Sequence, residues 1–187
     1  INKAIEMVSK RGGGKVIIPT GIWLTGPIRL RSNVNLYLEE GALVVFSKNF
    51  DDYPLIKTSF EGLNTYRCIS PIYAYKEKNI AITGKGIIDG SGEAWRPVKK
   101  SKLTDSQWRK LIASGGVVDE KNEIWYPSEK SYNGALISQM NVPVQLKTIE
   151  EFEAVKDFLR PVMVSLIECK NILLDGVTFQ NSPAWNI

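Results

Sequence analysis

Short runs of aliphatic residues alternate with turns rich in Gly, Pro and Asn in the first part of the chain. The runs cover residues 15–19, 22–25, 28–30, 34–38 and 42–46. Apolar runs of this length are typical of short strands that are shielded on both faces, as in stacked parallel strands. Residues 1–10 place apolar side chains on one helical face and precede three glycines, which predicts a helix that ends there. Residues 51–66 are expected to form a loop.

One motif occurs three times and gives the clearest indication of the fold. Each copy opens with an Asn, runs through aliphatic residues to a turn with Gly, and leads into a second short strand; the copies begin at Asn33, Asn79 and Asn171. Asn tolerates a left-handed backbone, and stacked Asn side chains form hydrogen bonds along a column. A repeated strand–turn–strand unit without a long helix predicts an all-β solenoid, whose function usually lies on one lateral face.

The repeat is interrupted over residues 96–160. A helix-like stretch begins at Thr104, and the segment after Thr148 matches a capping box followed by apolar residues at helical spacing, which predicts a helix over 148–159. We therefore predict a single solenoid domain over 1–187 with a partly helical insertion over 96–160 on one side. Inserted loops of solenoids often bind ligands.

The composition is that of an ordinary globular protein. Of the 187 residues, 43% are hydrophobic and 24% are charged, and the longest apolar runs are too short to span a bilayer. The net charge of +4 and the pI of about 9.0 mildly favour an acidic partner. The positive charges are scattered and no nucleic-acid-binding motif accompanies them, so we expect neither a nucleic-acid nor a membrane partner. The chain opens within a predicted helix, so we expect its natural start upstream, and a missing leader says nothing about secretion.

Histidine is absent and cysteine is scarce. The chain has no His and two Cys, Cys68 and Cys169, without a C-x-x-C spacing. This excludes a Ser-His-Asp or Cys-His catalytic arrangement and the usual zinc sites within these residues, so we expect no metal and no cofactor. Cys169 is interpreted as a small apolar residue rather than as half of a disulfide.

The acidic residues that suggest catalysis are better explained as turn residues. Asp89 and Glu93 lie four positions apart, but Asp89 precedes Gly90, and an Asp in such a turn accepts backbone hydrogen bonds. Asp175 has the same interpretation. Asp51 and Asp52 suggest a calcium loop, but no further oxygen ligand is apparent nearby, so a solvated loop is favoured. The chain therefore offers no catalytic residues of its own.

Several segments resemble glycoside hydrolase family 28, the polygalacturonase family, in their order and spacing. They cover residues 12–21, 28–34, 39–42, 79–92 with Trp95, 160–161, 169–171, 176–178 and 181–187, which is nearly the whole chain apart from the insertion. The resemblance implies a right-handed parallel β-helix. It also implies hydrolysis of galacturonate-containing polysaccharides such as pectin, with inversion at the anomeric carbon.

The family's catalytic motifs are missing from this chain. In the family, an Asn-x-Asp element, an Asp-Asp pair, a Gly-His-Gly element and an Arg-x-Lys element all follow the Asn-Ser-Pro-x-Trp segment, which here is 181–185. The resemblance therefore implies the N-terminal portion of such an enzyme, with the catalytic aspartates beyond residue 187. We expect the 187-residue chain alone to be inactive.

Aromatic and basic residues supply the candidates for substrate binding. A flat apolar ring stacks on a sugar face, and Arg pairs with a carboxylate. Trp23 is expected in the core, whereas other aromatic and basic residues lie at turns, in the insertion or beside strands: Trp95, Trp125, Tyr126, Trp185, Arg96, Arg160 and Lys170. We select Trp185, Arg160 and Trp95 as substrate-binding residues, although a surface charge is the simpler explanation of each basic residue taken alone.

Two other functions remain open at this stage. One is a non-enzymatic β-helix that binds polysaccharide or serves as an adhesin. The other is a pectate lyase, also a β-helix, which would need calcium and a basic residue that abstracts a proton. For the hydrolase we expect a monomer acting on an acidic plant cell-wall polysaccharide, outside the cell or in the periplasm. The sequence leaves open whether cleavage is internal or terminal, and the insertion could close one end of a cleft.

Overall fold

The computed structural model describes residues 1–137 and 142–186, which form two compact units. The first unit comprises Ile1–Tyr53, Ile69–Gly92 and Val162–Ile187, and the second comprises Pro54–Cys68 and Glu93–Pro161. Two parts of the predictions lie outside the described residues, namely residues 138–141 of the insertion and Ile187 of the family-like C-terminal segment.

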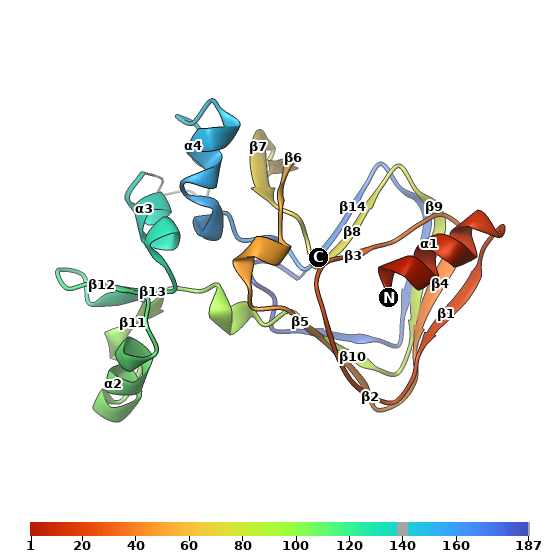
Figure 1. The fold of residues 1–187 in the computed structure, drawn as a ribbon, viewed down its shortest axis with the longest axis horizontal. Coiled ribbons are helices and arrows are strands. Elements are labelled where there is room, and N and C mark those ends of the chain that lie inside the picture. The colour runs from red at the N-terminus through yellow and green to blue at the C-terminus, as the bar shows by residue number, and fades with distance from the viewer. Residues whose placement is uncertain (138–141, 187) are drawn as a thin grey trace. The chain divides into compact units, whose positions relative to one another are not determined.

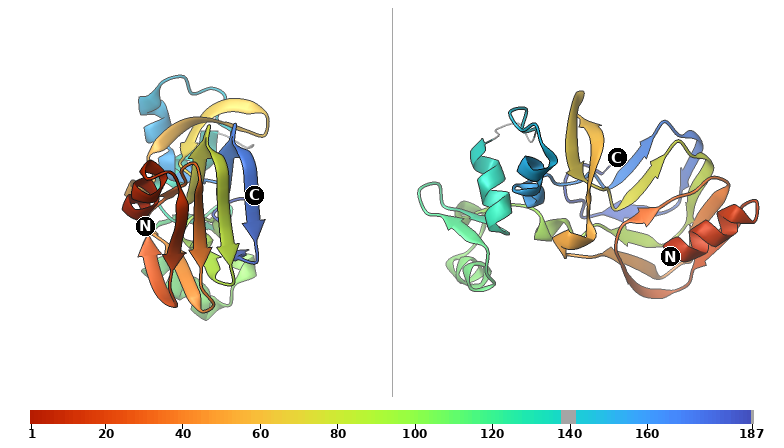
Figure 2. Two further views of the ribbon diagram at one scale, coloured as in Figure 1. Left: turned by 90° about the vertical axis from the view of Figure 1, so that its right-hand side faces the viewer. Right: turned by 45° about the horizontal axis from the view of Figure 1, so that its top comes forward.

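The first unit is a stack of coils that form three parallel sheets (Figures 1 and 2). The first three coils contribute one strand to each sheet, and the described part of the last coil contributes strands to sheets A and B. Sheet A contains β1 (Gly14–Ile18), β4 (Val34–Leu38), β9 (Lys78–Gly84) and β15 (Lys170–Asp175). Sheet B contains β2 (Gly21–Thr25), β5 (Ala42–Phe46), β10 (Ile87–Asp89) and β16 (Thr178–Gln180). Sheet C contains β3 (Ile28–Arg29), β8 (Ile72–Tyr75) and β14 (Val164–Ile167). This arrangement is a parallel β-helix, which confirms the predicted fold class.

Aliphatic residues fill the interior of the coils in register. Leu36 pairs with Ile82 between β4 and β9, and Val44 pairs with Ile88 between β5 and β10; all four side chains are fully buried. Stacking like residues on like positions buries a continuous apolar column, and that burial is the main stabilising contribution of a solenoid. The α1 helix (Asn2–Lys10) was predicted and packs Ile5 onto the first coil with no exposed surface.

The three Asn residues of the repeat form the predicted hydrogen-bonded column. Nδ2 of Asn79 donates to Oδ1 of Asn33 over 2.9 Å, and Nδ2 of Asn171 donates to Oδ1 of Asn79 over 2.8 Å. All three residues adopt a left-handed backbone, with φ between 54° and 63°. The repeat motif of the sequence therefore corresponds to the coil of the structure.

The expectation of a loop over 51–66 is wrong for most of that segment. Only Phe50–Asp52 is a short 3-10 turn, and β6 (Leu55–Phe60) and β7 (Leu63–Cys68) form an antiparallel hairpin in the second unit. Glu61 and Gly62 connect the strands with φ of 51° and 80°. Positive φ at both loop positions is typical of a type I′ turn, which usually has the sequence Asn-Gly or Asp-Gly. The Glu-Gly sequence found here therefore gave little indication of a hairpin.

The rest of the second unit combines short helices with a small antiparallel sheet. Its helices are α2 (Asp105–Ala113), α3 (Glu129–Ile137) and α4 (Ile149–Glu153), and its sheet has the order β11 (Val98–Lys99), β13 (Ile124–Tyr126), β12 (Val117–Asp119). Further 3-10 turns lie at Lys100–Lys102 and Lys156–Phe158, and another, Gly92–Ala94, spans the point in the sequence where the first unit ends and the second continues. Helices at 104 and 148 were predicted, and both begin with the capping box of Thr104 and Thr148. None of the helices in the described ranges is long and apolar enough to cross a membrane.

The predicted helix over 148–159 is shorter than expected. It ends after Glu153, and the chain continues as the 3-10 turn Lys156–Phe158. The break lets Phe152, Phe158 and Leu159 all bury their side chains, and Oδ2 of Asp157 accepts a 2.6 Å hydrogen bond from Ser128. Tertiary packing therefore overrides the helical spacing.

The two segments of the second unit are inserted at the same step of the repeating coil. Pro54–Cys68 follows β5 and precedes β8, and Glu93–Pro161 follows β10 and precedes β14, so both are inserted between a strand of sheet B and a strand of sheet C. The prediction of one domain with a single insertion over 96–160 remains a prediction. The compact unit seen in the structure also contains the earlier segment.

Candidate functional site

Trp185 is held at the corner where the last coil approaches sheet C. Its carbonyl oxygen accepts hydrogen bonds from the Met163 amide (2.8 Å) and from Oγ of Ser182 (2.7 Å). Its side chain is 61% exposed. A fixed backbone with an exposed indole is suitable for stacking on a sugar ring, because little conformational entropy is lost on binding.

At the neighbouring corner, the carboxylate of Asp89 accepts hydrogen bonds that stabilise the fold. Its Oδ1 accepts hydrogen bonds from the Ser91 amide (2.8 Å) and from Nδ2 of Asn181 (3.1 Å). Its Oδ2 accepts a 2.9 Å hydrogen bond from Nε2 of Gln180 in the next coil. A carboxylate with these contacts closes the turn and joins two coils, which supports the interpretation of Asp89 as a turn residue.

Arg160 lies beside a buried arginine in the second unit. Its carbonyl oxygen accepts a 3.0 Å hydrogen bond from Nε of Arg67 and a second one from Nη2 of Arg67. Burial lowers the pKa of Arg160, and the positive charge of Arg96 lowers it further. The side chains of Arg67, Arg96 and Arg160 therefore lie near one another, and the negative charge of Glu61 partly offsets their positive charge.

The buried partner, Arg67, is held by packing as well as by hydrogen bonds. Its side chain is almost fully buried, and its guanidinium carbon lies 3.7 Å from the centroid of the Phe60 ring. Burial is the main reason that the pKa of Arg67 falls to about 10. Sequence reasoning missed this residue, because nothing in its local sequence marks a buried arginine.

Trp95 does not fit the role expected from the sequence. Its side chain has no exposed surface, so it offers no face to a sugar. The turn position suggested exposure, but the residue is fully buried. Trp125 and Tyr126 are also buried, in β13, whereas Trp23, expected in the core, is 38% exposed in β2.

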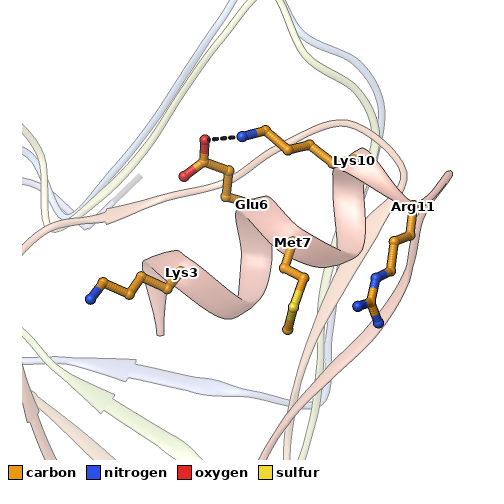
Figure 3. A pocket seen from close by; sticks show the side chains of 5 residues that line it. All are labelled: Lys3, Glu6, Met7, Lys10 and Arg11. Atoms are coloured by element: carbon orange, nitrogen blue, oxygen red, sulfur yellow. Dashed lines mark ion pairs between the residues drawn. The ribbon is translucent and has the colours of Figure 1, made fainter.

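The remaining candidates are separate features. Cys68 and Cys169 are both free thiols. No group of three or more His, Cys, Asp or Glu residues in the described ranges is arranged to hold a metal ion. A shallow hollow of about 290 Å³ lies on the exposed side of α1 and is spanned by the 2.9 Å ion pair of Glu6 and Lys10 (Figure 3). Its lining comes from this one helix and the residue after it, so we assign it no function.

Comparisons with known proteins agree with this fold. The chain is 24% identical over 197 aligned residues to a probable polygalacturonase of Vitis vinifera, covering 98% of this chain and 29% of that protein. It is 35% identical over 100 residues to an exo-poly-alpha-D-galacturonosidase of Dickeya chrysanthemi, covering 49% of this chain and 16% of that protein. No family model matches the chain.

A solved structure shows the same likeness in three dimensions. A hyperthermoactive exopolygalacturonase from Thermotoga maritima superposes with a TM-score of 0.64 at 29% sequence identity, covering 99% of this chain and 38% of that one. These comparisons confirm the resemblance to the polygalacturonases of glycoside hydrolase family 28. The chain spans 29% and 38% of the lengths of the Vitis and Thermotoga proteins.

Proposed function

We propose that the whole protein is a glycoside hydrolase that cleaves galacturonate-containing polysaccharide and releases sugar from the chain ends. The observation that carries the proposal is the match over 98% of this chain to a probable polygalacturonase, together with the fold of an exopolygalacturonase at 29% identity. Terminal cleavage is proposed because the Dickeya and Thermotoga proteins are both named as exo-acting enzymes. Both comparisons favour the hydrolase over a non-enzymatic binding protein or adhesin.

The catalytic carboxylates are proposed to lie outside residues 1–187. Inverting hydrolysis needs a carboxylic acid and a carboxylate base roughly 6.5–9.5 Å apart, with a water molecule between them. Asp89 accepts one hydrogen bond within its own turn and two from the next coil, which supports a structural role. The chain is proposed to contribute binding residues: Trp185 stacks on a sugar ring, and Arg160 pairs with a carboxylate.

The setting of the protein follows from its proposed substrate. Pectin-like polymers are acidic, and the net charge of +4 supports attraction to them. We therefore propose an acidic plant cell-wall polysaccharide as substrate, a location outside the cell or in the periplasm, and a monomeric enzyme. A membrane, a nucleic acid and a cofactor have no part in the proposal.

The test is the release of reducing sugar from polygalacturonate by the whole protein. We expect release from polygalacturonate, none from a neutral galactan, and no loss of activity in excess chelator. Activity that disappears with chelator would point to a calcium-dependent lyase instead. No release from any galacturonate polymer would contradict the proposal. The 187-residue chain alone should show no turnover, and turnover abolished by Asp89→Asn or Glu93→Gln would place the chemistry within this chain.

A further inference from the structure

The strand β2 forms an open edge of sheet B in the first coil. It pairs with β5 on one side, where the Gly21 amide donates to the Gly41 carbonyl oxygen over 3.1 Å. Because the backbone groups of successive residues point to opposite sides of a strand, the N–H and C=O groups of Ile22 and Leu24 point away from β5. No hydrogen-bond partner for these groups is found in the described part of the chain. An edge of this kind is a template for a further strand.

The side chains on this edge are apolar and highly exposed. Ile22 and Leu24 are 78% and 76% exposed, the two highest values among the exposed large apolar residues that the structure describes. One coil further on, Leu43 pairs with Ile22 and Val45 pairs with Leu24, so they occupy the same outward positions. Leu43 and Val45 have a strand on each side and are half-buried. Ile22 and Leu24 therefore lack the cover that a neighbouring strand gives.

The interior of the coil is also incompletely covered at β2. Trp23 points inward, since it pairs with Val44, which has no exposed surface, yet Trp23 is 38% exposed. The inward residues Val16 of β1 and Ile28 of β3 are buried. The α1 helix packs against β1, β3 and β4 and adds Ile5 to the core (Figure 1). The helix thus caps the coil at β1 and β3, whereas Trp23 at β2 stays partly exposed.

The other two strands of the first coil are protected against further pairing. In β3, the Arg29 amide donates a 2.8 Å hydrogen bond to Oδ1 of Asn2. In β1, the exposed Lys15 places a charge on the edge, and charged side chains, Lys above all, discourage the pairing of edge strands. The sequence of β2, Gly-Ile-Trp-Leu-Thr, contains neither a charge nor a proline. We therefore expect this edge to be covered in the whole protein.

A segment of the same polypeptide suits this edge better than a second copy of the protein does. A strand of five residues is about 17 Å long, so two such edges would bury far less than the roughly 1,200 Å² of a stable interface. A segment of the same polypeptide is held nearby at high effective concentration and needs no such area. The chain spans 29% and 38% of the Vitis and Thermotoga proteins, which therefore have long further segments.

We propose that an extended segment of the whole protein, outside residues 1–187, adds a strand to sheet B at the free edge of β2. Its backbone pairs with the N–H and C=O groups of Ile22 and Leu24. Its outward side chains are apolar at alternate positions and pack against these two residues, and an inward apolar side chain covers Trp23. The proposal concerns the fold of the whole protein and does not depend on its proposed activity.

The first test is amide hydrogen exchange of the whole protein, resolved to single residues by mass spectrometry. The matched control is β1, in which Lys15 and Ile17 alternate with the residues that bond to β4, so their amides also point to an edge. We expect the amides of Ile22 and Leu24 to exchange at least about a hundredfold more slowly than those of Lys15 and Ile17. Comparable rates at the two edges would overturn the proposal.

A proline variant tests whether the backbone of β2 is bonded on its outer side. Proline is tolerated in an edge strand where its N–H would face solvent, but it prevents pairing where that N–H is bonded. Leu24→Pro should bring the exchange rate of the Ile22 amide to within about threefold of the Lys15 rate. Ile17→Pro, the control, should leave the Ile22 amide slow. Unchanged protection of Ile22 in a folded Leu24→Pro variant would contradict a paired edge.

The added segment is identified by photo-crosslinking from position 24 of the whole protein. Leu24→Cys is modified with a short thiol-reactive photo-crosslinker, Ile17→Cys serves as the control, and the joined peptides are identified by mass spectrometry. The natural thiols, Cys68 and Cys169, are distinguished by their own peptides. We expect position 24, and not position 17, to join to a segment outside residues 1–187 of the same molecule.

Three crosslinking results would overturn the proposal. They are a link from position 24 to a second copy, links to residues 1–187 alone, and the absence of any link. Sugar release from polygalacturonate is measured on the same preparation. Release without protection of Ile22 and Leu24 would refute only the added strand, and protection without release would refute only the hydrolase proposal.

Discussion

Nδ2 of Asn171 donates a hydrogen bond to Oδ1 of Asn79 over 2.8 Å, although the two residues are 92 positions apart in the chain. The segment Glu93–Pro161 lies between them in sequence and belongs to the other compact unit. The coil therefore resumes after the insertion in the same register. The left-handed Asn at the start of β4, β9 and β15 is the feature that aligns one of these coils with the next.

The middle residue of this column should be the most sensitive to substitution. Asn79→Ala removes two inter-coil hydrogen bonds. It also places Ala, which lacks the side-chain amide that helps Asn to tolerate a left-handed backbone, at φ 54°. We expect a loss of about 2–3 kcal/mol in the free energy of unfolding, measured by urea denaturation. Asn79→Gly also loses the side-chain amide, but Gly adopts the left-handed backbone without strain. Its loss in the free energy of unfolding should therefore be smaller. Equal stability of Asn79→Ala and the natural protein would show that the column contributes nothing.

Gly84 is required by the close approach of two coils. A Cβ at this position would lie 1.9 Å from the Leu38 carbonyl oxygen, and its φ is +116°. Gly84→Ala should therefore destabilise the first unit by about 3 kcal/mol or more, since the neighbouring backbone cannot move away.

Gly12→Ala is the matched control for this prediction. Gly12 lies in the same unit with φ +103°, but nothing lies within 4 Å of its added Cβ. Only backbone strain of about 1 kcal/mol is expected there. Comparable thermal shifts for the two variants would refute the steric explanation.

The fold was predictable because its signals are local and repeated. The Asn repeat with its glycine turns, the helix-like stretch after Thr104 and the capping box at Thr148 can all be read within a few residues. The hairpin over 55–68 was missed because a Glu-Gly loop is an uncommon carrier of a type I′ turn.

The site was less predictable, because it depends on which coils are neighbours. Trp95 and Trp185 both occupy turn-like sequence, yet one is fully buried and the other is 61% exposed. The pairing of Asp89 with Gln180 is a matter of inter-strand register. No spacing along the chain indicates that register until the coils are aligned.

Glu77 should make part of the stability depend on pH. Burial alone would raise its pKa, but the hydrogen bonds from Ser32 and Arg31 outweigh burial and hold the pKa below its ordinary value. A lowered folded-state pKa contributes stability that is present above the unfolded-state pKa and is lost as the pH falls through the folded-state pKa. Glu77→Gln should therefore cost about 1–2 kcal/mol at neutral pH, and the difference should shrink in acid.

The control for Glu77 is the exposed acid of the next coil. Glu168 pairs with Lys76 at 3.6 Å, and its side chain is 58% exposed. Glu168→Gln should change the free energy of unfolding by less than about 0.5 kcal/mol at any of these pH values. If both variants lose the same stability with the same pH profile, the hydrogen bonds of Glu77 have no special role.

The two thiols should differ in reactivity. Cys68 is almost fully buried, and burial raises its pKa to about 12, whereas Cys169 is half-buried. Because the thiolate is the reactive form, a maleimide should label Cys169 at least about tenfold faster than Cys68 in the native protein. The two rates should converge in denaturant, as followed by mass spectrometry of peptides. Faster labelling of Cys68 in the native protein would contradict its buried position.

The most direct test of the central claim is the identity of the products that the whole protein releases from polygalacturonate, followed over time by chromatography and mass spectrometry. We expect saturated galacturonate to be released progressively while the polymer remains long, as for hydrolysis from chain ends. Unsaturated products, or an unchanged polymer at every enzyme concentration, would contradict it.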